Sequence, residues 1–318
     1  MWGLQQELKL TSFCSTKMNS PLLKEELSEI QENILLKNYT TFKIGGHARY
    51  FLVVKEKEQL LKAVKLAKKL KIPFFILGGG SNLLVSDGGF NGLVIKMGIL
   101  GAEFKGNKLF AGAGESLSKL TFLSAGKGLS GLEWAGGIPS ATAGGAIYGH
   151  AQAFGEKISK AVESVEALDS NTLKFKNFSN KQCRFSVKNS IFKKNKNIII
   201  VSCILRLKPD DKNDIKNKVE EFLNYRKERH PDFPSAGSVF VNPEKNGETI
   251  RVGALIEKCG LKGKKIGNAQ ISEQHANFII NLGGAKAEDV LRLINLAKQK
   301  VKKTFGVELE QEIQIVGF

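Results

Sequence analysis

The sequence of 318 residues predicts an α+β protein in which a large ligand-binding region precedes a smaller C-terminal region. Between residues 48 and 97 the apolar pattern changes from strand type to helix type and back. A second stretch, residues 136–155, is rich in glycine and alanine, and the pattern of strands and helices restarts after a polar segment at residues 209–214. The chain exceeds one typical hydrophobic core, so two or three domains are expected.

The first part is expected to be a β-α-β unit. Residues 50–54 are apolar throughout, whereas the apolar residues of 60–70 recur at helical spacing. A buried strand at 73–77 leads into the run Gly78-Gly79-Gly80-Ser81-Asn82, and another strand is expected at 93–97. The run lacks both the G-x-G-x-x-G spacing and a following helix, which argues against a Rossmann nucleotide fold. Its backbone N–H groups could cradle a pyrophosphate, although by itself an ordinary glycine turn is an equal alternative.

The middle of the chain predicts a second group of strands. Residues 108–114 form an expected strand, and residues 117–125 show one face of a helix that ends at Gly126-Lys127-Gly128. Small residues in 136–155 would let the backbone approach a flat or phosphorylated ligand, with simple packing as the alternative. Residues 162–168 and 173–175 indicate a hairpin, and the β-branched run 198–207 indicates a central strand.

The polar segment 209–214 is the expected boundary of the C-terminal region. Helices are expected from there to about residue 229 and at 252–259, a strand at 278–281, and a helix at 287–305 closed by Gly306. Alternating apolar residues at 307–315 predict a last strand that carries Glu308, Glu310 and Glu312 on one face. Such carboxylates usually face solvent. A carboxylate in a cleft would have a raised pKa, and the pattern does not say which of the three that would be.

The formal net charge of +17 would suit a polyanionic partner. The lysines are nevertheless spread along the whole chain with few aromatics set for base stacking, which favours a solvated surface over a nucleic-acid site. The four cysteines show no C-x-x-C spacing and no nearby histidine pairs, so neither zinc nor disulfides are expected. No apolar run has the length of a signal peptide or a membrane span. A cytoplasmic protein without a metal follows, with residues 1–30 as an N-terminal extension and Met18 as an alternative start.

Taken together and in order, several motifs resemble the UDP-N-acetylenolpyruvoylglucosamine reductase family over nearly the whole chain. They are Thr41-Phe42-Lys43-Ile44-Gly45-Gly46, Leu77-Gly78-Gly79-Gly80-Ser81-Asn82-Leu83-Leu84, Gly131-Leu132-Glu133-Trp134-Ala135-Gly136-Gly137-Ile138-Pro139, residues 234–243, Leu261-Lys262-Gly263-Lys264-Lys265-Ile266-Gly267, His275-Ala276-Asn277-Phe278 and Leu309-Glu310-Gln311-Glu312. The resemblance implies an FAD-binding region of the vanillyl-alcohol-oxidase (PCMH) type at residues 31–210, with subdomains of about 31–97 and 98–210. A C-terminal α+β substrate domain at 211–318 follows. The short connection from Gly155 to Arg226 is similar to the family's second type, which lacks an inserted capping loop.

The resemblance also implies the reaction and its residues. NADPH reduces FAD, and the enolpyruvyl ether of the UDP-sugar then takes the hydride, giving the UDP-N-acetylmuramate of peptidoglycan synthesis. Ser238, which by spacing alone reads as a turn serine, would donate a proton, Glu312 would stabilise the enolate, and Lys188 would stand where the family carries arginine. Substrate contacts would come from Arg226, Asn242 and His275. The implied FAD contacts are Gly78, Gly79, Gly80, Ser81, Asn82, Leu83, Gly136, Gly137, Ile138, Pro139, Gly144, Gly145 and Ala146.

Two departures from the family pattern leave alternatives open. Lysine at 188 keeps the charge but loses the bidentate fork of arginine, and the loop 138–146 is one residue longer than the family's. A flavin oxidoreductase acting on another substrate and a catalytically impaired homologue are therefore rivals, and a basic nucleic-acid-binding protein is a third. FAD is expected to bind non-covalently, with attachment at His150 as the alternative because that residue falls in a proposed flavin loop.

Overall fold

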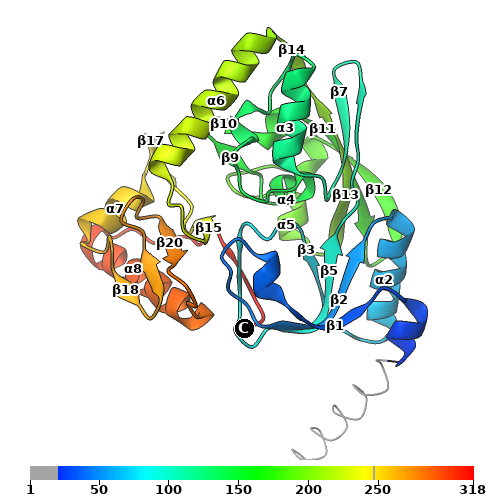
Figure 1. The fold of residues 1–318 in the computed structure, drawn as a ribbon, viewed down its shortest axis with the longest axis horizontal. Coiled ribbons are helices and arrows are strands. Elements are labelled where there is room, and N and C mark those ends of the chain that lie inside the picture. Colours follow the sequence, from blue (N-terminus) through cyan, green and yellow to red (C-terminus); the bar gives the residue numbers. More distant parts are fainter. Residues whose placement is uncertain (1–20, 246–247) are drawn as a thin grey trace, which may run out of the picture.

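The computed structural model describes residues 21–245 and 248–318 as three groups of elements around a common centre (Figure 1). The first group is a sheet in the order β1-β2-β5-β3. Its strands are β1 (Gln31–Leu35), β2 (His47–Val54), β5 (Phe90–Met97) and β3 (Phe74–Leu77), and helix α2 (Lys57–Lys69) buries its apolar face against them. Strands β2 and β3 both pair with β5 in parallel, which confirms the expected β-α-β unit.

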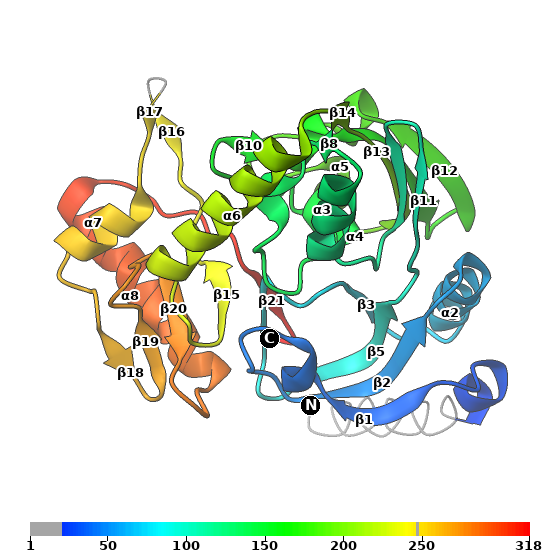
Figure 2. The ribbon, with the colours of Figure 1, turned by 45° about the horizontal axis from the view of Figure 1, so that its top comes forward.

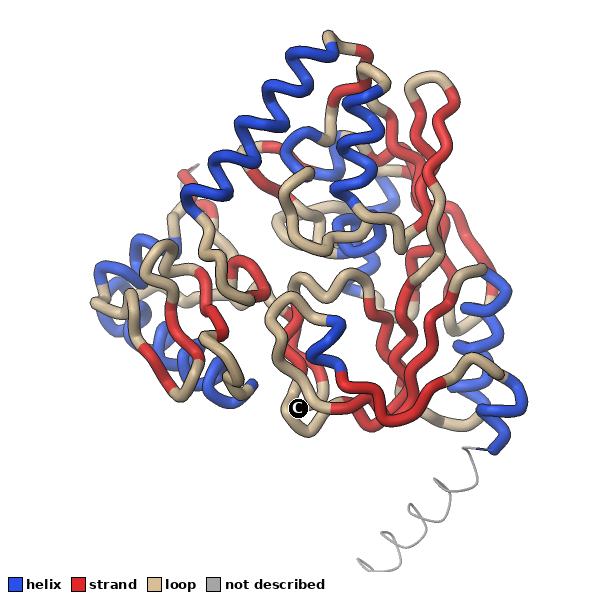
Figure 3. Tube along the Cα trace, in the orientation of Figure 1, coloured by secondary structure: helices blue, strands red, loops and turns tan. Residues whose placement is uncertain are grey.

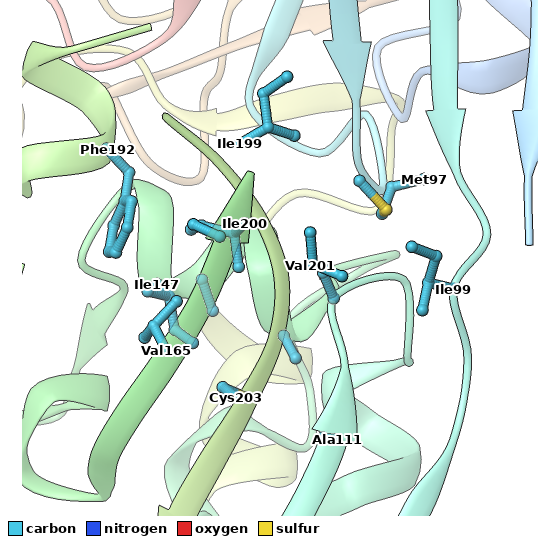
Figure 4. Close-up of a cluster of buried hydrophobic side chains, with 14 of the residues drawn as sticks. Met97, Ile99, Ala111, Ile147, Val165, Phe192, Ile199, Ile200, Val201 and Cys203 are labelled. Atoms are coloured by element: carbon cyan, nitrogen blue, oxygen red, sulfur yellow. The ribbon is translucent and has the colours of Figure 1, made fainter. Parts of the chain in front are cut away.

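The second group is an antiparallel sheet in the order β12-β11-β13-β7-β6. Its strands are β12 (Lys174–Ser179), β11 (Val162–Asp169), β13 (Ile198–Arg206), β7 (Lys108–Gly112) and β6 (Ala102–Lys105). This confirms the hairpin and the central strand. Helices α3 (Leu117–Gly126), α4 (Ala143–Tyr148) and α5 (Ile191–Lys194) accompany the sheet. Figure 4 shows side chains of α4, α5 and β13 meeting in one core.

The third group contains a sheet in the order β15-β20-β19-β18 and two helices. The strands are β15 (Ser235–Ser238), β20 (Phe278–Asn281), β19 (Ala269–Ile271) and β18 (Lys265–Ile266), and the helices are α7 (Val252–Lys258) and α8 (Ala287–Phe305). Helix α8 ends as expected, because Gly306 has a φ of 67° in the left-handed region. A short hairpin of β16 (Glu244–Lys245) and β17 (Glu248–Thr249) precedes α7.

The predicted last strand is wrong in extent. Only β21 (Gln314–Val316) is a strand, and it pairs in parallel with β4 (Leu83–Val85) of the first group. Residues 307–313 instead cross between groups, and their backbone bonds go to the segment after β15, as from the N–H of Glu312 to the carbonyl of Val239 at 2.8 Å. The three glutamates therefore do not share a strand face. Glu308 pairs with Lys302 at 2.6 Å and is exposed, like Glu310, while Glu312 is half-buried.

Helix α6 (Lys212–Arg229) runs from the second group toward the third (Figure 2). Its buried residues Ile215 and Val219 lie in its first half, which contacts α3 and the short helix η2 (Glu133–Ala135). The expected boundary near residue 211 remains a prediction. We propose that α6 acts as the connector between the regions.

The first and third groups exchange parts of their cores. Phe42 and Ile44 are buried in the hydrophobic cluster of the third group, and the side-chain amide of Asn281 donates to the carbonyl of Phe42 at 3.0 Å. In return, Val316 of β21 is buried in a cluster of the first group. The Thr41–Gly46 motif of the sequence thus joins the two ends of the chain.

Part of the expected N-terminal extension packs on the core. Leu23 and Leu27 are buried beside α2 and β2. Residues 1–20, including Met18 and Cys14, lie outside the described residues. Within the described ranges the cysteines are free thiols, no group of three potential metal ligands occurs, and no helix has the length and apolarity of a membrane span.

Candidate functional site

A cleft of about 2130 Å³ lies at the meeting point of the three groups. Figure 3 shows that the parts of the groups that face one another are largely loops. All the predicted catalytic and substrate residues line this cleft, together with most of the predicted cofactor residues. Those that line it are Gly78, Gly79, Gly80, Ser81, Asn82, Leu83, Ile138, Pro139, Gly144, Gly145, Ala146, Lys188, Arg226, Ser238, Asn242, His275 and Glu312.

The first glycine loop is shaped by close approaches that only glycine permits. A Cβ at Gly79 would overlap the carbonyl oxygen of Ser140, and one at Gly80, where φ is 71°, would overlap the carbonyl oxygen of Tyr39. Within the part of the chain described, the backbone N–H groups of Gly79, Gly80 and Ser81 have no hydrogen-bond acceptor. Unpaired N–H groups in a turn form an anion-binding concavity. The loop therefore fits a phosphate group.

The second loop packs directly against the first, since Ser140 and Thr142 lie beside Gly79 and Gly78. Thr142 caps α4, since its hydroxyl accepts a bond from the N–H of Gly145 at 3.2 Å. A Cβ at Gly144 would lie 2.9 Å from the Cβ of Ala113, so this glycine lets α4 approach the end of β7. Gly136 and Gly137, which we expected at the cofactor, do not line the cleft. They pack instead toward Val219 and Arg226 of α6, which is the packing role left open for this stretch.

Ser238 and Glu312 come together because their segments pair. Ser238 ends β15 opposite Phe278, and the next residue, Val239, accepts the backbone bond from Glu312. The side-chain amide of Asn82 donates to the carbonyl of Glu312 at 3.2 Å, which ties the first glycine loop to the same point. The predicted proton donor, the predicted stabiliser and the first loop thus meet at one end of the cleft.

Lys188 reaches this point from the second group. Its ammonium pairs with the Glu312 carboxylate at 2.8 Å, and both side chains are largely buried. Lys188 lies in a tight turn closed by Ser186 and Asn189, with a φ of 50°. Its carbonyl accepts a bond from the ammonium of Lys193 at 2.9 Å. The turn therefore holds the lysine beside Glu312, and its replacement of a family arginine stays a prediction.

Arg226 and two histidines also line the cleft. The Arg226 guanidinium lies 5.0 Å from the centre of the Phe154 ring, and burial lowers its pKa. Burial, helped by Arg226, lowers the pKa of His230 to about 4, and burial also lowers the pKa of His275. Both imidazoles are therefore neutral at pH 7 and serve as hydrogen-bonding groups. Asn242 uses its carbonyl oxygen to accept from the N–H of Val252 at 3.0 Å, at the start of α7.

His150 points away from the cleft. Its ring is buried, one nitrogen contacts the carbonyl of Ser186 at 2.5 Å, and the other contacts the Ser159 hydroxyl at 2.8 Å. It does not line the cleft, although its neighbours Gly149 and Ala151 do. This geometry disfavours the alternative of a covalent flavin link at His150.

Sequence reasoning did not assign several polar residues of the cleft lining to the site, among them Lys96, Tyr148, His230 and Gln314. The Tyr148 hydroxyl donates to the side-chain carbonyl of Gln314 at 3.2 Å. The ammonium of Lys96 donates to the carbonyl of Gly78. Only Lys96 carried a signal, because it is the one charged residue in the apolar run from Leu93 to Met97.

Comparison with known proteins shows the class of protein to which this chain belongs. An FAD-binding-domain model matches residues 48–172, and the model of the C-terminal domain of UDP-N-acetylenolpyruvoylglucosamine reductase matches residues 229–316. The protein is an FAD-dependent oxidoreductase, with an FAD-binding region of the vanillyl-alcohol-oxidase type and a C-terminal α+β domain, as expected.

The curated relatives narrow the class to one family. The chain is 39% identical to the UDP-N-acetylenolpyruvoylglucosamine reductase of Anoxybacillus flavithermus, over 95% of this chain and 99% of the relative. It is 44% identical to that of Caldicellulosiruptor bescii, over 93% of each. The crystal structure of the Thermus caldophilus reductase superposes with a TM-score of 0.76 at 34% identity, covering 91% of this chain and all of that one. The chain belongs to the UDP-N-acetylenolpyruvoylglucosamine reductase family.

Proposed function

We propose that the protein reduces UDP-N-acetylglucosamine enolpyruvate to UDP-N-acetylmuramate with NADPH through FAD, as a cytoplasmic step of peptidoglycan precursor synthesis. The observation that carries the proposal is the convergence of Ser238, Glu312 and Lys188 at one end of a cleft that also contains the first glycine loop. The free N–H groups of Gly79, Gly80 and Ser81 would hold the pyrophosphate of FAD, and the loop from Ile138 to Ala146 would lie along the cofactor. Bound FAD supplies the hydride.

The chain's own residues would handle the charge and the proton. When the β-carbon of the enolpyruvyl group receives a hydride, the electron pair of the double bond moves to the α-carbon and into the adjacent carboxylate. A bare Glu312 carboxylate would oppose that charge, but here it holds the Lys188 ammonium at 2.8 Å, so the pair presents a cation to the enolate. The Ser238 hydroxyl then gives its proton to the α-carbon and is reprotonated from solvent.

The same cleft would hold the nucleotide sugar. Arg226, Asn242 and His275 line it, and arginine suits the phosphates of UDP. NADPH would occupy the same cleft before the sugar arrives. Between Gly155 and Arg226 the chain forms short strands and helices with no long loop to cover the cleft. This supports the second type of the family, which lacks the capping loop.

A second candidate is a flavin reductase for a related but different carboxylate. The observation that favours it is Lys188, since one ammonium cannot bind a carboxylate in the bidentate way that a guanidinium does. Turnover with the enolpyruvyl UDP-sugar, compared with simpler enolpyruvyl ethers, separates the two candidates. Faster turnover with a substrate that lacks UDP would favour the second one.

The two half-reactions test the proposed roles. In Ser238→Ala, reduction of FAD by NADPH should keep its rate, whereas reoxidation by the enolpyruvyl substrate should slow about 10²-fold or more, because only that step needs the proton. Glu312→Gln should show the same asymmetry, because the Glu312 carboxylate holds the Lys188 ammonium that faces the enolate. Stopped-flow absorbance of the flavin measures both steps.

The matched control is Ser118→Ala, on α3 and outside the cleft lining, which should leave both half-reactions unchanged. If Ser238→Ala slowed both half-reactions equally, Ser238 would be a structural turn serine. A wild-type protein whose reduced flavin is not reoxidised by the substrate would disprove the proposed function itself.

A further inference from the structure

Lys96 lies where the first sheet meets the cleft. It belongs to β5, where it pairs in register with Leu77, the last residue of β3. The chain continues from Leu77 into the glycine loop. The Lys96 ammonium donates to the carbonyl of Gly78, the first residue of that loop. One of its three N–H groups is therefore used by the protein, and the side chain also lines the cleft.

No carboxylate of the described residues pairs with Lys96. Other partly buried lysines do have such partners, as in the pairs of Lys188 with Glu312 at 2.8 Å and of Lys108 with Glu163 at 2.8 Å. Burial alone lowers the pKa of Lys96. A buried ammonium without a counter-ion is costly, and an anion bound beside it would remove that cost.

We propose that Lys96 supplies the positive charge that binds the pyrophosphate of FAD. The ammonium contacts the loop that carries the unpaired N–H groups of Gly79, Gly80 and Ser81, so cation and backbone donors would bind one anion together. UDP and NADPH also carry pyrophosphates. The glycine loop, which falls within the matched FAD-binding domain, assigns this ammonium to FAD.

The charge of Lys96 and its bond to Gly78 can be separated by substitution. Lys96→Gln keeps an N–H donor for the Gly78 carbonyl but removes the charge, and Lys96→Arg keeps both. Lys108→Gln is the control, since Lys108 is a half-buried strand lysine with a carboxylate partner and lies outside the cleft. FAD released on dilution of the holoenzyme, followed by flavin fluorescence, gives the dissociation constant at several salt concentrations.

We expect Lys96→Gln to weaken FAD binding about tenfold to a hundredfold, the usual effect of losing a charge-assisted hydrogen bond. The salt dependence of binding should also decrease, because one ionic contact is gone. Lys96→Arg should bind FAD within about threefold of the wild type. ADP, used as a competitor that carries only the pyrophosphate and adenosine, should lose affinity in parallel with FAD. Lys108→Gln should change none of these values.

An unchanged FAD dissociation constant in Lys96→Gln would overturn the proposal. So would a loss confined to UDP binding by the oxidised holoenzyme, which would assign the ammonium to the sugar nucleotide. If Lys96→Arg lost FAD as strongly as Lys96→Gln and both variants unfolded at lower temperature, Lys96 would only support the Gly78 carbonyl. None of these readouts depends on turnover, so they stand apart from the test of the proposed function.

Discussion

Lys188 is a residue at which we expect this chain to depart from its family inside the candidate site. Its ammonium pairs with the Glu312 carboxylate, and its backbone has a φ in the left-handed region. Its carbonyl accepts a hydrogen bond from the Lys193 ammonium. The turn gives Lys188 this left-handed backbone conformation. Binding the substrate carboxylate would favour arginine, whose planar guanidinium can donate two parallel hydrogen bonds.

Lys188→Arg is therefore expected to bind the substrate carboxylate better and to raise turnover. A tenfold gain corresponds to about 1.4 kcal/mol of barrier. Steady-state kcat with the enolpyruvyl substrate measures the effect, and Lys194→Arg on the exposed side of α5 is a matched control. An unchanged or lower kcat would mean that the site is built around lysine.

The half-buried His230 predicts how stability depends on pH. The pKa of His230 is lowered to about 4 in the folded protein, below its ordinary value of 6.5. The unfolded chain therefore binds more protons between these values, and stability is complete above pH 6.5 and declines as the pH falls toward 4. The slope is at most about 1.4 kcal/mol per pH unit for one such group, and less after solvent screening. Urea unfolding of wild type and His230→Asn across this range should show a flatter profile in the variant, and parallel profiles would contradict the assignment.

At the residue scale, motifs pointed to side chains that line the cleft, but the roles given to those side chains stay predictions. Ser238 and Glu312 line the cleft, yet neither shows its role by spacing. They are neighbours because the segments after β15 and before β21 pair, which is a contact between residues far apart in sequence. Gly136 and Gly137 belong to a glycine-rich motif, but they serve helix packing. Composition cannot distinguish a glycine that admits a ligand from one that admits a helix.

At the scale of elements, helices with clear ends were predicted well. Helix α8 occupies the expected residues because an apolar stripe and the Gly306 cap specify both its face and its end. The last strand was overpredicted, since alternation of apolar residues also arises where a crossing segment buries side chains in two different cores. Leu309 and Ile313 are buried in the cluster of the third group, whereas Val316 is buried in that of the first.

The contact between the two glycine loops is an element-level feature with a measurable effect. In Gly79→Ala the added methyl group would overlap the carbonyl of Ser140, so the loops must separate. We expect loss of FAD binding by at least an order of magnitude together with lower thermal stability, because a backbone atom cannot move aside as a side chain can. Flavin content and the unfolding temperature measure this. Gly88→Ala, at an exposed position where an added Cβ would meet only the Ser86 hydroxyl at an ordinary contact distance of 3.5 Å, should behave as the wild type. Full flavin content in Gly79→Ala would contradict the loop geometry.

For the whole molecule, the cleft predicts a yellow protein whose FAD is held without a covalent bond. His150 is engaged by Ser186 and Ser159 away from the cleft, and the described cysteines are absent from the cleft lining. Acid precipitation should therefore release all flavin into the supernatant, where its absorbance can be measured. Flavin that remains with the precipitated polypeptide would contradict this expectation.

The exchange of core residues between the two ends of the chain has a consequence for how the protein is made. Strand β4 can pair only after its partner β21 has been made, about 230 residues later in the sequence. Phe42 and Ile44 likewise become buried only when the cluster around α8 is present. During translation the first sheet emerges from the ribosome long before either partner exists. The unpaired β4 and the exposed side chains of Phe42 and Ile44 can then make wrong contacts, and contacts of such long sequence separation form slowly. We therefore expect folding of the nascent chain to end in one late step. In that step β21 leaves the ribosome, pairs with β4 and completes the flavin cleft.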